Sequence, residues 1–257
     1  SHRWWCNCQV EYGIGRDMIK LIDIFRAMKY LDSPLLADWY LRHRRKLLKF
    51  CDLHKGESCF IIGNGPSLNK MDLSLLKGNH VFGLNKVHLL LKRFNLDLTY
   101  HVAVNSLVIE QCITEFNKLT CPSFLSFGAA RQLTSGMDHI YFLATDSYFQ
   151  APYSFYRNPL QPITEGYTVT YVAMQLAFYM GFSKVFLIGI DHNFIAVGNP
   201  NEEQVLNGDD QNHFDPGYFS NMKWHLPDLE ASEMFYRMAK WSYERDERKI
   251  FDATIGG

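Results

Sequence analysis

From residue 57 onward, short runs of apolar, β-forming residues alternate with helical segments, and this alternation constrains the fold of the 257-residue chain most strongly. Several runs lack the polar alternation of a half-exposed strand, as expected of strands buried on both faces. Strands separated by helical segments predict an α/β fold, in which helices cover both faces of a mostly parallel, Rossmann-like sheet. The expected strands are residues 58–62, 81–84, 100–104, 123–127, 140–143, 184–190 and 249–253.

Two helical regions accompany this pattern. Residues 1–56 predict a helical N-terminal extension, and residues 57–257 predict one Rossmann-like domain. The segment 166–182 is apolar almost all round, which predicts a buried helix that ends at Gly181. In the extension, the residues at helical spacing are Ile19, Ile22, Phe25 and Arg26, then Leu36, Trp39 and Tyr40.

The charge and hydropathy of the chain limit its partners. A net charge of −1 gives no overall field that would gather nucleic acid, so we expect no nucleic-acid partner. No apolar run approaches the roughly 18 residues that a membrane span needs, and no signal peptide opens the chain. These features predict a cytoplasmic protein. The segment 40–49, YLRHRRKLLK, is basic and amphipathic, which fits either a solvated helix face or a peripheral contact with anionic lipid at the inner face of the membrane.

The cysteines indicate a reducing compartment and no zinc site. Cys6 and Cys8 form a C-x-C pair, but no second pair completes a set of metal ligands. Free thiols in the cytoplasm are the simpler interpretation. The other cysteines are scattered: Cys51, Cys59, Cys112 and Cys121.

The loop after the first expected strand raises the question of a ligand. The stretch CFIIGNGPSLNKMD, residues 59–72, is apolar up to Gly63 and then turns tightly through Gly-Asn-Gly-Pro-Ser. It is not a dinucleotide fingerprint, because Leu68 stands where the third glycine belongs, and it lacks the Gly-Lys-Ser/Thr of a P-loop. It nevertheless follows a strand, and ligands of parallel sheets bind at the carboxyl ends of the strands.

Polar residues follow other expected strands as well. HVFGLN ends in Asn85, YHVAVNS ends in Asn105 and Ser106, and KVFLIGID ends in Gly189 and Asp191. Each of these residues taken alone fits a turn. Their recurrence favours a nucleotide pocket, because amides both donate and accept hydrogen bonds and glycines admit a ligand close to the backbone. The strand-end candidates for nucleotide binding are Gly63, Asn64, Gly65, Pro66, Ser67, Asn85, Asn105, Ser106, Gly189 and Asp191.

A long polar segment at 196–228 predicts a lid. Loops of this length without structure are uncommon in compact domains and often close over active sites. The lid contains His213 and His225, and a histidine carried on a lid can act as a general base when the lid closes. An exposed loop histidine without a role is the alternative. We expect His225 to pack at the start of the following helix, near Pro227.

Four stretches in this order carry a family resemblance: IIGNGPSL, VFGLN, AVNSL and ITEGYTVTYVAMQLAFYMGFSKVFLIGID. With them, residues 57–257 resemble the bacterial sialyltransferases of glycosyltransferase family 42 and the wider superfamily around them. That superfamily includes motility-associated flagellin glycosylation factors and an archaeal 6-hydroxymethylpterin pyrophosphokinase. The C-terminal part, from NHFDPGYF onward, is most similar to uncharacterised members.

The resemblance implies an inverting glycosyltransferase that uses a CMP-linked sugar acid, with a glycan or protein as acceptor and no metal cofactor. Such an enzyme would act in the glycosylation of surface glycans, such as lipopolysaccharide, or of proteins such as flagellin. It also implies that His213 is the general base. The residues that it places at the nucleotide are Asn64, Gly65, Ser67, Asn85 and Asn105, the turn of Thr164, Glu165 and Gly166, and the strand end of Gly189 and Asp191.

Three departures leave the donor sugar open. The sialyltransferases carry an arginine where this chain has Pro162, a serine where it has Glu165, and a tyrosine where it has Asn193. Tyr153, Tyr156, Arg157 and Tyr218 are candidate replacements.

The alternative is a pyrophosphokinase of the 6-hydroxymethylpterin type, which uses ATP and Mg²⁺. Its carboxylate ligands would come from Asp191, Glu165, Asp209 and Asp210. The sequence leaves the acceptor and the oligomeric state open.

Overall fold

We analysed a computed structural model of the chain, which describes residues 27–30, 32–134, 136–147, 152–195 and 197–256. The expected helical positions Ile19, Ile22, Phe25 and Arg26 lie outside the described residues, as do Cys6 and Cys8.

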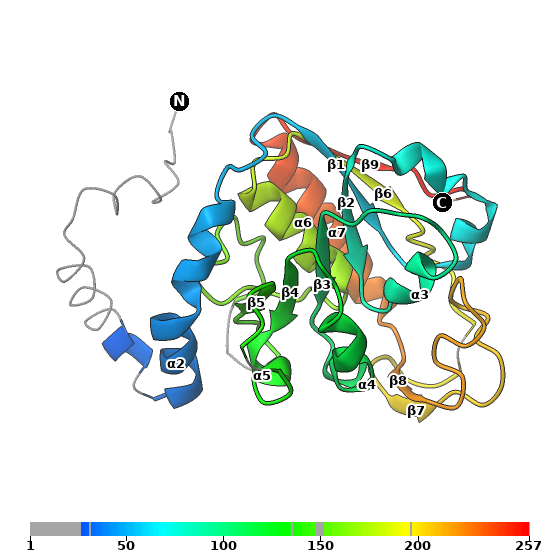
Figure 1. The fold of residues 1–257 in the computed structure, drawn as a ribbon, viewed down its shortest axis with the longest axis horizontal. Coiled ribbons are helices and arrows are strands. Elements are labelled where there is room, and N and C mark those ends of the chain that lie inside the picture. The colour runs from blue at the N-terminus through cyan, green and yellow to red at the C-terminus, as the bar shows by residue number, and fades with distance from the viewer. Residues whose placement is uncertain (1–26, 31, 135, 148–151, 196, 257) are drawn as a thin grey trace.

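A seven-stranded parallel sheet forms the centre of the molecule (Figure 1), in the order β5-β4-β3-β2-β1-β6-β9. All seven strands predicted from the sequence are present, and the mostly parallel α/β fold is confirmed. The strands predicted at 100–104, 123–127, 184–190 and 249–253 each end one or two residues earlier than expected; in the strand that begins at Lys184, the reason is Gly189, whose φ of +65° turns the chain. The strands are β1 (Ser58–Ile62), β2 (His80–Leu84), β3 (Tyr100–Ala103), β4 (Ser123–Ser126), β5 (Ile140–Leu143), β6 (Lys184–Ile188) and β9 (Lys249–Asp252).

Successive side chains point to opposite faces of the sheet, and both faces are covered except at the edge strand β9, which is largely exposed. Ile61 and Phe82 pack into one hydrophobic core, together with α6 (Val169–Tyr179) and α7 (Leu229–Glu244). Ile62 and Val81 pack into the core on the other face. The shorter elements of that second face are η4 (Pro66–Lys70), η5 (Leu73–Leu76), α3 (His88–Leu91), α4 (Ser106–Phe116) and α5 (Phe127–Ala130).

Helix α6 is the buried helix predicted from the apolar segment 166–182. Thr168 caps its start, and its side chains from Thr170 to Tyr179 are buried. Gly181 ends it with a φ of +93°, and a Cβ at this position would lie 2.9 Å from Lys55 Cα. Glycine is therefore required here both for its left-handed backbone and for the close approach of the 52–57 turn.

The described part of the N-terminal extension is helical and packs into the same core as the sheet. It comprises η2 (Met28–Tyr30), α2 (Pro34–Arg42) and η3 (Arg44–Phe50). Trp39 is fully buried, and its indole Nε1 donates a hydrogen bond to Phe142 O at 2.8 Å. Within the basic segment 40–49, Leu47 belongs to this core, so the segment is not a helix solvated all round. Lipid contact by its exposed part stays a prediction, and no helix in the described residues is long and apolar enough to cross a membrane.

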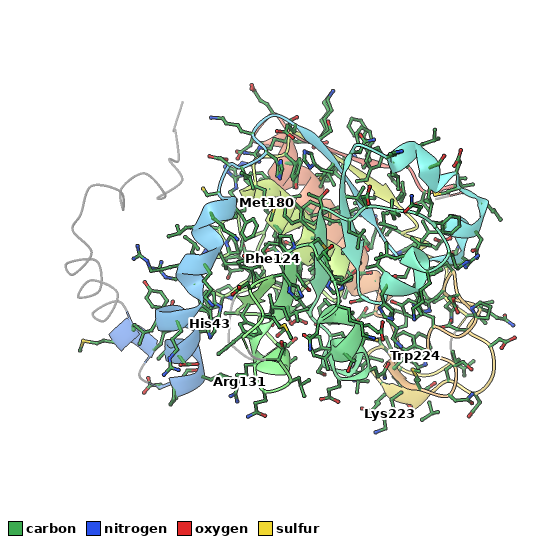
Figure 2. All side chains as sticks on the ribbon, in the orientation of Figure 1. His43, Phe124, Arg131, Met180, Lys223 and Trp224 are labelled. Atoms are coloured by element: carbon green, nitrogen blue, oxygen red, sulfur yellow. The ribbon has the colours of Figure 1, made fainter. Side chains whose placement is uncertain are left out.

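The polar segment 196–228 is not structureless, contrary to expectation. It contains a two-stranded antiparallel hairpin of β7 (Glu203–Val205) and β8 (Lys223–His225). Figure 2 labels two neighbours in β8: Trp224 is buried, whereas the Lys223 side chain is 60% exposed. The segment packs against the sheet through a hydrophobic plug of four aromatic residues and one leucine: Phe214, Tyr218, Phe219, Trp224 and Leu226. The plug explains why so polar a segment has a defined path.

Candidate active site

A cavity of about 1210 Å³ lies at the carboxyl ends of the strands. Asn85 after β2, Asn105 after β3 and Asp146 after β5 form its floor, and the hairpin supplies His213, Trp224 and His225. Among the predicted site residues, those that line it are Asn85, Asn105, Ser106, Glu165, Gly166 and His213.

Three helices begin at this cavity, and their N-cap residues belong to its lining. The Asn105 amide oxygen accepts from Val108 N at 3.2 Å and caps α4. Thr168 caps α6, and Asp228 caps α7. The start of a helix carries a partial positive charge and N–H groups without helical partners. The described lining contains no Lys or Arg and includes the carboxylates of Asp146, Glu165 and Asp228, so the helix starts are its candidates for contact with an anionic ligand.

His213 is oriented as a proton acceptor. Its Nδ1 lies 2.8 Å from Oδ2 of Asp210, whose side chain is 1% exposed. The carboxylate therefore holds the proton on Nδ1, and Nε2 of the neutral ring keeps its lone pair. The ring stacks on Tyr218 with centroids 4.0 Å apart and an interplanar angle of 2°, and Phe219 contacts it edge-on. Packing and hydrogen bonding together fix the imidazole at the cavity wall.

His225 has the opposite tautomer. Its Nδ1 lies 3.2 Å from the amide nitrogen of Asn105. That nitrogen must donate, because the amide oxygen of Asn105 already caps α4. The neutral His225 ring therefore carries its proton on Nε2 and can donate to a ligand. His225 lines the cavity, as do Pro227 and Asp228 at the start of α7, so its predicted place near that helix start is compatible with a place in the cavity wall.

Asn85 presents an unpaired acceptor. Its φ of +46° is in the left-handed region, and its backbone O accepts from His101 Nε2 at 2.9 Å. Burial lowers the pKa of His101 to about 4, so this histidine is a neutral structural support. The side-chain Oδ1 of Asn85 is buried without a hydrogen-bond partner.

Glu165 is the second unpaired acceptor of the cavity. Its Oε1 has no partner, and burial raises its pKa to about 7, with a smaller contribution from the charge of Asp146. Burial also raises the pKa of Asp146, although that carboxylate accepts from Glu165 N at 2.8 Å. Near neutral pH, Glu165 is therefore divided between its protonated and ionised forms.

The remaining predicted residues form a neighbouring cluster outside the cavity lining. Ser67 donates its hydroxyl to Asp191 at 2.6 Å, and a Cβ on Gly65 would lie 1.8 Å from Asp191 Oδ2. Gly63 N donates to Ile188 O. The glycines of this loop therefore admit another chain segment, and contact with a nucleotide stays a prediction. The predicted residues placed outside the lining are Gly63, Asn64, Gly65, Pro66, Ser67, Thr164, Gly189 and Asp191.

The lid segment is anchored on this cluster. Phe214 N donates to Asn64 O at 2.9 Å, and Asn69 and Arg93 donate to Phe214 O. The buried Nζ of Lys86 donates to Tyr218 O at 2.6 Å and lies 4.2 Å from the Phe219 ring centroid. These contacts fix Phe214 and Tyr218, and thereby the backbone position and the stacking partner of His213.

Several site residues were missed in the sequence. Asp146 follows β5, so the same strand-end rule that selected Asn85 and Asn105 applies to it. Lys86 had no signal of its own, because its partners are more than a hundred residues away. Of the candidate replacements, Tyr153 lines the cavity, whereas Arg157 pairs with Asp246 at 2.8 Å.

Three carboxylates belong to the lining, but within the described residues their oxygens do not gather into a set of three within 4.8 Å of one another. Asp146, Glu165 and Asp228 line the cavity. Of the four ligands named for the alternative function, Glu165 is the one that lines the cavity. Asp210 pairs with His213, Asp191 accepts from Ser67, and Asp209 is exposed.

Comparison with known proteins gave a family and similar solved structures. Residues 40–196 match the protein family described as 6-hydroxymethylpterin diphosphokinase MptE-like. A search of curated proteins gave no match. Among solved structures, that of the MAf glycosyltransferase from Magnetospirillum magneticum AMB-1 is similar, with a TM-score of 0.49 and 15% sequence identity over 85% of this chain. The chain spans 36% of that protein's chain.

Proposed function

The chain belongs to the 6-hydroxymethylpterin diphosphokinase MptE-like family, and we propose that it is a transferase that directs an acceptor hydroxyl against a nucleotide-activated donor. For the donor we propose a CMP-linked sugar acid, which makes the reaction an inverting glycosyl transfer. The observation that carries this proposal is that His213, oriented as a proton acceptor, lines the same cavity as the N-termini of three helices. The sequence motifs shared with the sialyltransferases support the choice of donor.

Each step has a group in the cavity wall. His213 Nε2 removes the hydroxyl proton as the acceptor oxygen bonds to the anomeric carbon, and the bond from that carbon to the CMP phosphate oxygen breaks. The starts of α4, α6 and α7, together with Nε2–H of His225, stabilise the charge on the departing phosphate. Asn85 and Glu165 belong to the wall that would surround the donor. No step requires a metal ion.

A diphosphokinase is the second candidate, favoured by the three carboxylates of the lining. In that reaction the same hydroxyl would attack the β-phosphorus of ATP, the bond from that phosphorus to the α-phosphate oxygen would break, and AMP would leave. Mg²⁺ near the lining carboxylates, with one or two of them as ligands, would offset the triphosphate charge. His213 would have the same role as base in both reactions, so the donor distinguishes them.

Ligand-dependent unfolding separates the two candidates. CMP at 100 times its dissociation constant should stabilise the protein by about 2.7 kcal/mol, and EDTA should not change this. Asn85→Gly keeps the left-handed backbone but removes the amide, so CMP affinity should fall about 5-fold or more. Asn79→Gly, an exposed position before β2, is the matched control. Stabilisation by ATP with Mg²⁺ alone, abolished by EDTA, would replace the first candidate with the second.

The base is tested by kinetics. His213→Ala should lower kcat by about 10² to 10⁴ and leave CMP affinity nearly unchanged, because Nε2 meets the acceptor rather than the nucleotide. His225→Ala should instead weaken CMP binding. If His225→Ala is inactive with normal CMP affinity and His213→Ala is active, the two roles are reversed.

A further inference from the structure

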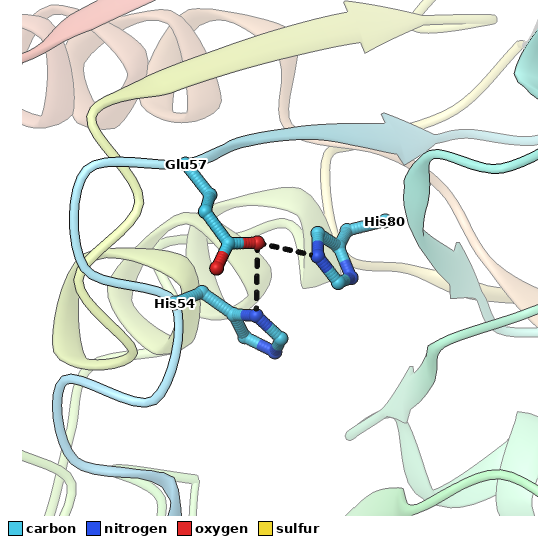
Figure 3. A group of neighbouring side chains, drawn as sticks. All are labelled: His54, Glu57 and His80. Atoms are coloured by element: carbon cyan, nitrogen blue, oxygen red, sulfur yellow. Dashed lines mark hydrogen bonds and ion pairs between the residues drawn. The ribbon is translucent and has the colours of Figure 1, made fainter.

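A second cluster of ionisable side chains lies at the amino ends of strands β1 and β2, whereas the cavity lies at the carboxyl ends of the strands. His54 and Glu57 belong to the turn before β1, and His80 is the first residue of β2 (Figure 3). Both imidazoles direct a nitrogen at the same carboxylate oxygen, Glu57 Oε2: His54 Nδ1 at 3.4 Å and His80 Nε2 at 2.6 Å. We propose that these three side chains form a binding site for a divalent transition metal, with Zn²⁺ as the favoured ion.

The donor set and spacing fit zinc. Zinc binds imidazole nitrogen and carboxylate oxygen at about 2.0–2.2 Å, so two ligand atoms of a tetrahedral site lie about 3.3–3.5 Å apart. The separation of His54 Nδ1 from Glu57 Oε2 has this value. The His80 contact has the length of a hydrogen bond and must open by roughly 0.8 Å to admit the ion. Two histidines and one glutamate leave the fourth position to water.

The surroundings orient the ligands. His54 Nε2 lies 2.6 Å from the hydroxyl of Tyr100, which can accept its proton and leave Nδ1 free for the metal. The ring of His54 also stacks on Phe182, with centroids 4.6 Å apart. This partner arrangement is typical of metal-bound histidines, in which the second nitrogen is held by a hydrogen bond.

The backbone around the cluster is fixed before any ion binds. In the turn, His54 N donates to Met180 O and Gly56 N donates to Gly181 O, which ties it to the end of α6. β1 pairs directly with β2, and Cys59 lies opposite His80. The ion can enter from solvent, since the side chains of Glu57 and His80 are 50% and 33% exposed. A bound ion would therefore link the turn to β2.

Zinc titration of the untagged full chain tests the proposal. The background carries Cys6→Ser and Cys8→Ser, because this C-x-C pair is a competing source of thiolate ligands. We expect one Zn²⁺ per chain and a rise in Tm on binding. Glu57→Gln and His80→Ala should each weaken Zn²⁺ binding at least 10-fold. His139→Gln, a half-buried histidine directly before β5, should bind as the parent does.

Co²⁺ supplies a second measurement. It should give visible d–d bands without thiolate charge-transfer bands, and these bands should disappear in Glu57→Gln. Because Glu57 is half exposed, this variant is expected to fold, and an unchanged Tm without metal verifies it. Absence of zinc binding in the parent, or binding that survives both Glu57→Gln and His80→Ala, shows that the cluster is a hydrogen-bonded triad without a metal.

Discussion

Replacing Glu165 by Gln should change how the stability of the protein depends on pH. Burial raises the pKa of Glu165 from 4.5 to about 7, so the ionised form is disfavoured in the folded state. Between pH 4.5 and 7, the unfolded chain has released this proton while the folded chain still holds it. Stability therefore falls as the pH rises through this window, and the loss is complete above about pH 7. The shift of 7 − 4.5 pKa units corresponds to about 3 kcal/mol at 1.36 kcal/mol per unit.

The assay is urea unfolding of the wild type and Glu165→Gln at pH 5 and pH 8. Gln reproduces the shape of the protonated acid but cannot ionise, so the variant should gain about 2–3 kcal/mol over the wild type between the two pH values. Glu244→Gln, an exposed position at the end of α7, is the control and should show no comparable gain. Equal stability differences for Glu165→Gln at both pH values would refute the claim that Glu165 is buried as an acid.

Two further predictions concern side chains that act on others. In the Asp210→Asn variant, the asparagine amide can donate to Nδ1 of His213, which moves the ring proton to Nε2. We expect kcat to fall roughly 10²-fold with unchanged CMP affinity. The control Asp209→Asn, at an exposed neighbouring position, should keep full activity. Gly65→Ala brings a methyl group within 1.8 Å of the Asp191 carboxylate and should lower the free energy of unfolding by about 1–3 kcal/mol, measured by urea unfolding; a loss below that would show that the loop relaxes freely.

The inner strands of the sheet were predictable because they are buried on both faces, whereas the edge strand β9 is largely exposed. The runs CFII (59–62) and VFLI (185–188) consist of apolar residues that pack into the two cores. Polar turns after such runs show where each strand ends. Helix α6 was predictable for the same reason, since its polar positions are few and Gly181 ends it. Local composition therefore carried the architecture.

The site was predicted only in part, because its geometry depends on contacts between distant segments. Asn85, Asn105 and His213 were found from their positions and do line the cavity. The Gly63–Ser67 loop has the composition of a ligand loop, but its glycines are explained by the approach of Asp191, 124 residues later than Ser67. The composition of the lid segment is mostly polar, yet five of its hydrophobic side chains are buried and anchor it. A single sequence gives no signal for such pairings.

The two histidines illustrate what the contacts add. His213 and His225 lie on one polar segment, and the sequence alone does not show which ring nitrogen of each carries the proton. A carboxylate beside Nδ1 makes the first a proton acceptor, and an amide N–H beside Nδ1 makes the second a proton donor. In the proposed glycosyl transfer the two would have different tasks: His213 would take the proton of the acceptor hydroxyl, and His225 would donate to the departing phosphate. The division of roles is therefore set by Asp210 and Asn105, through which nitrogen of each ring holds its proton.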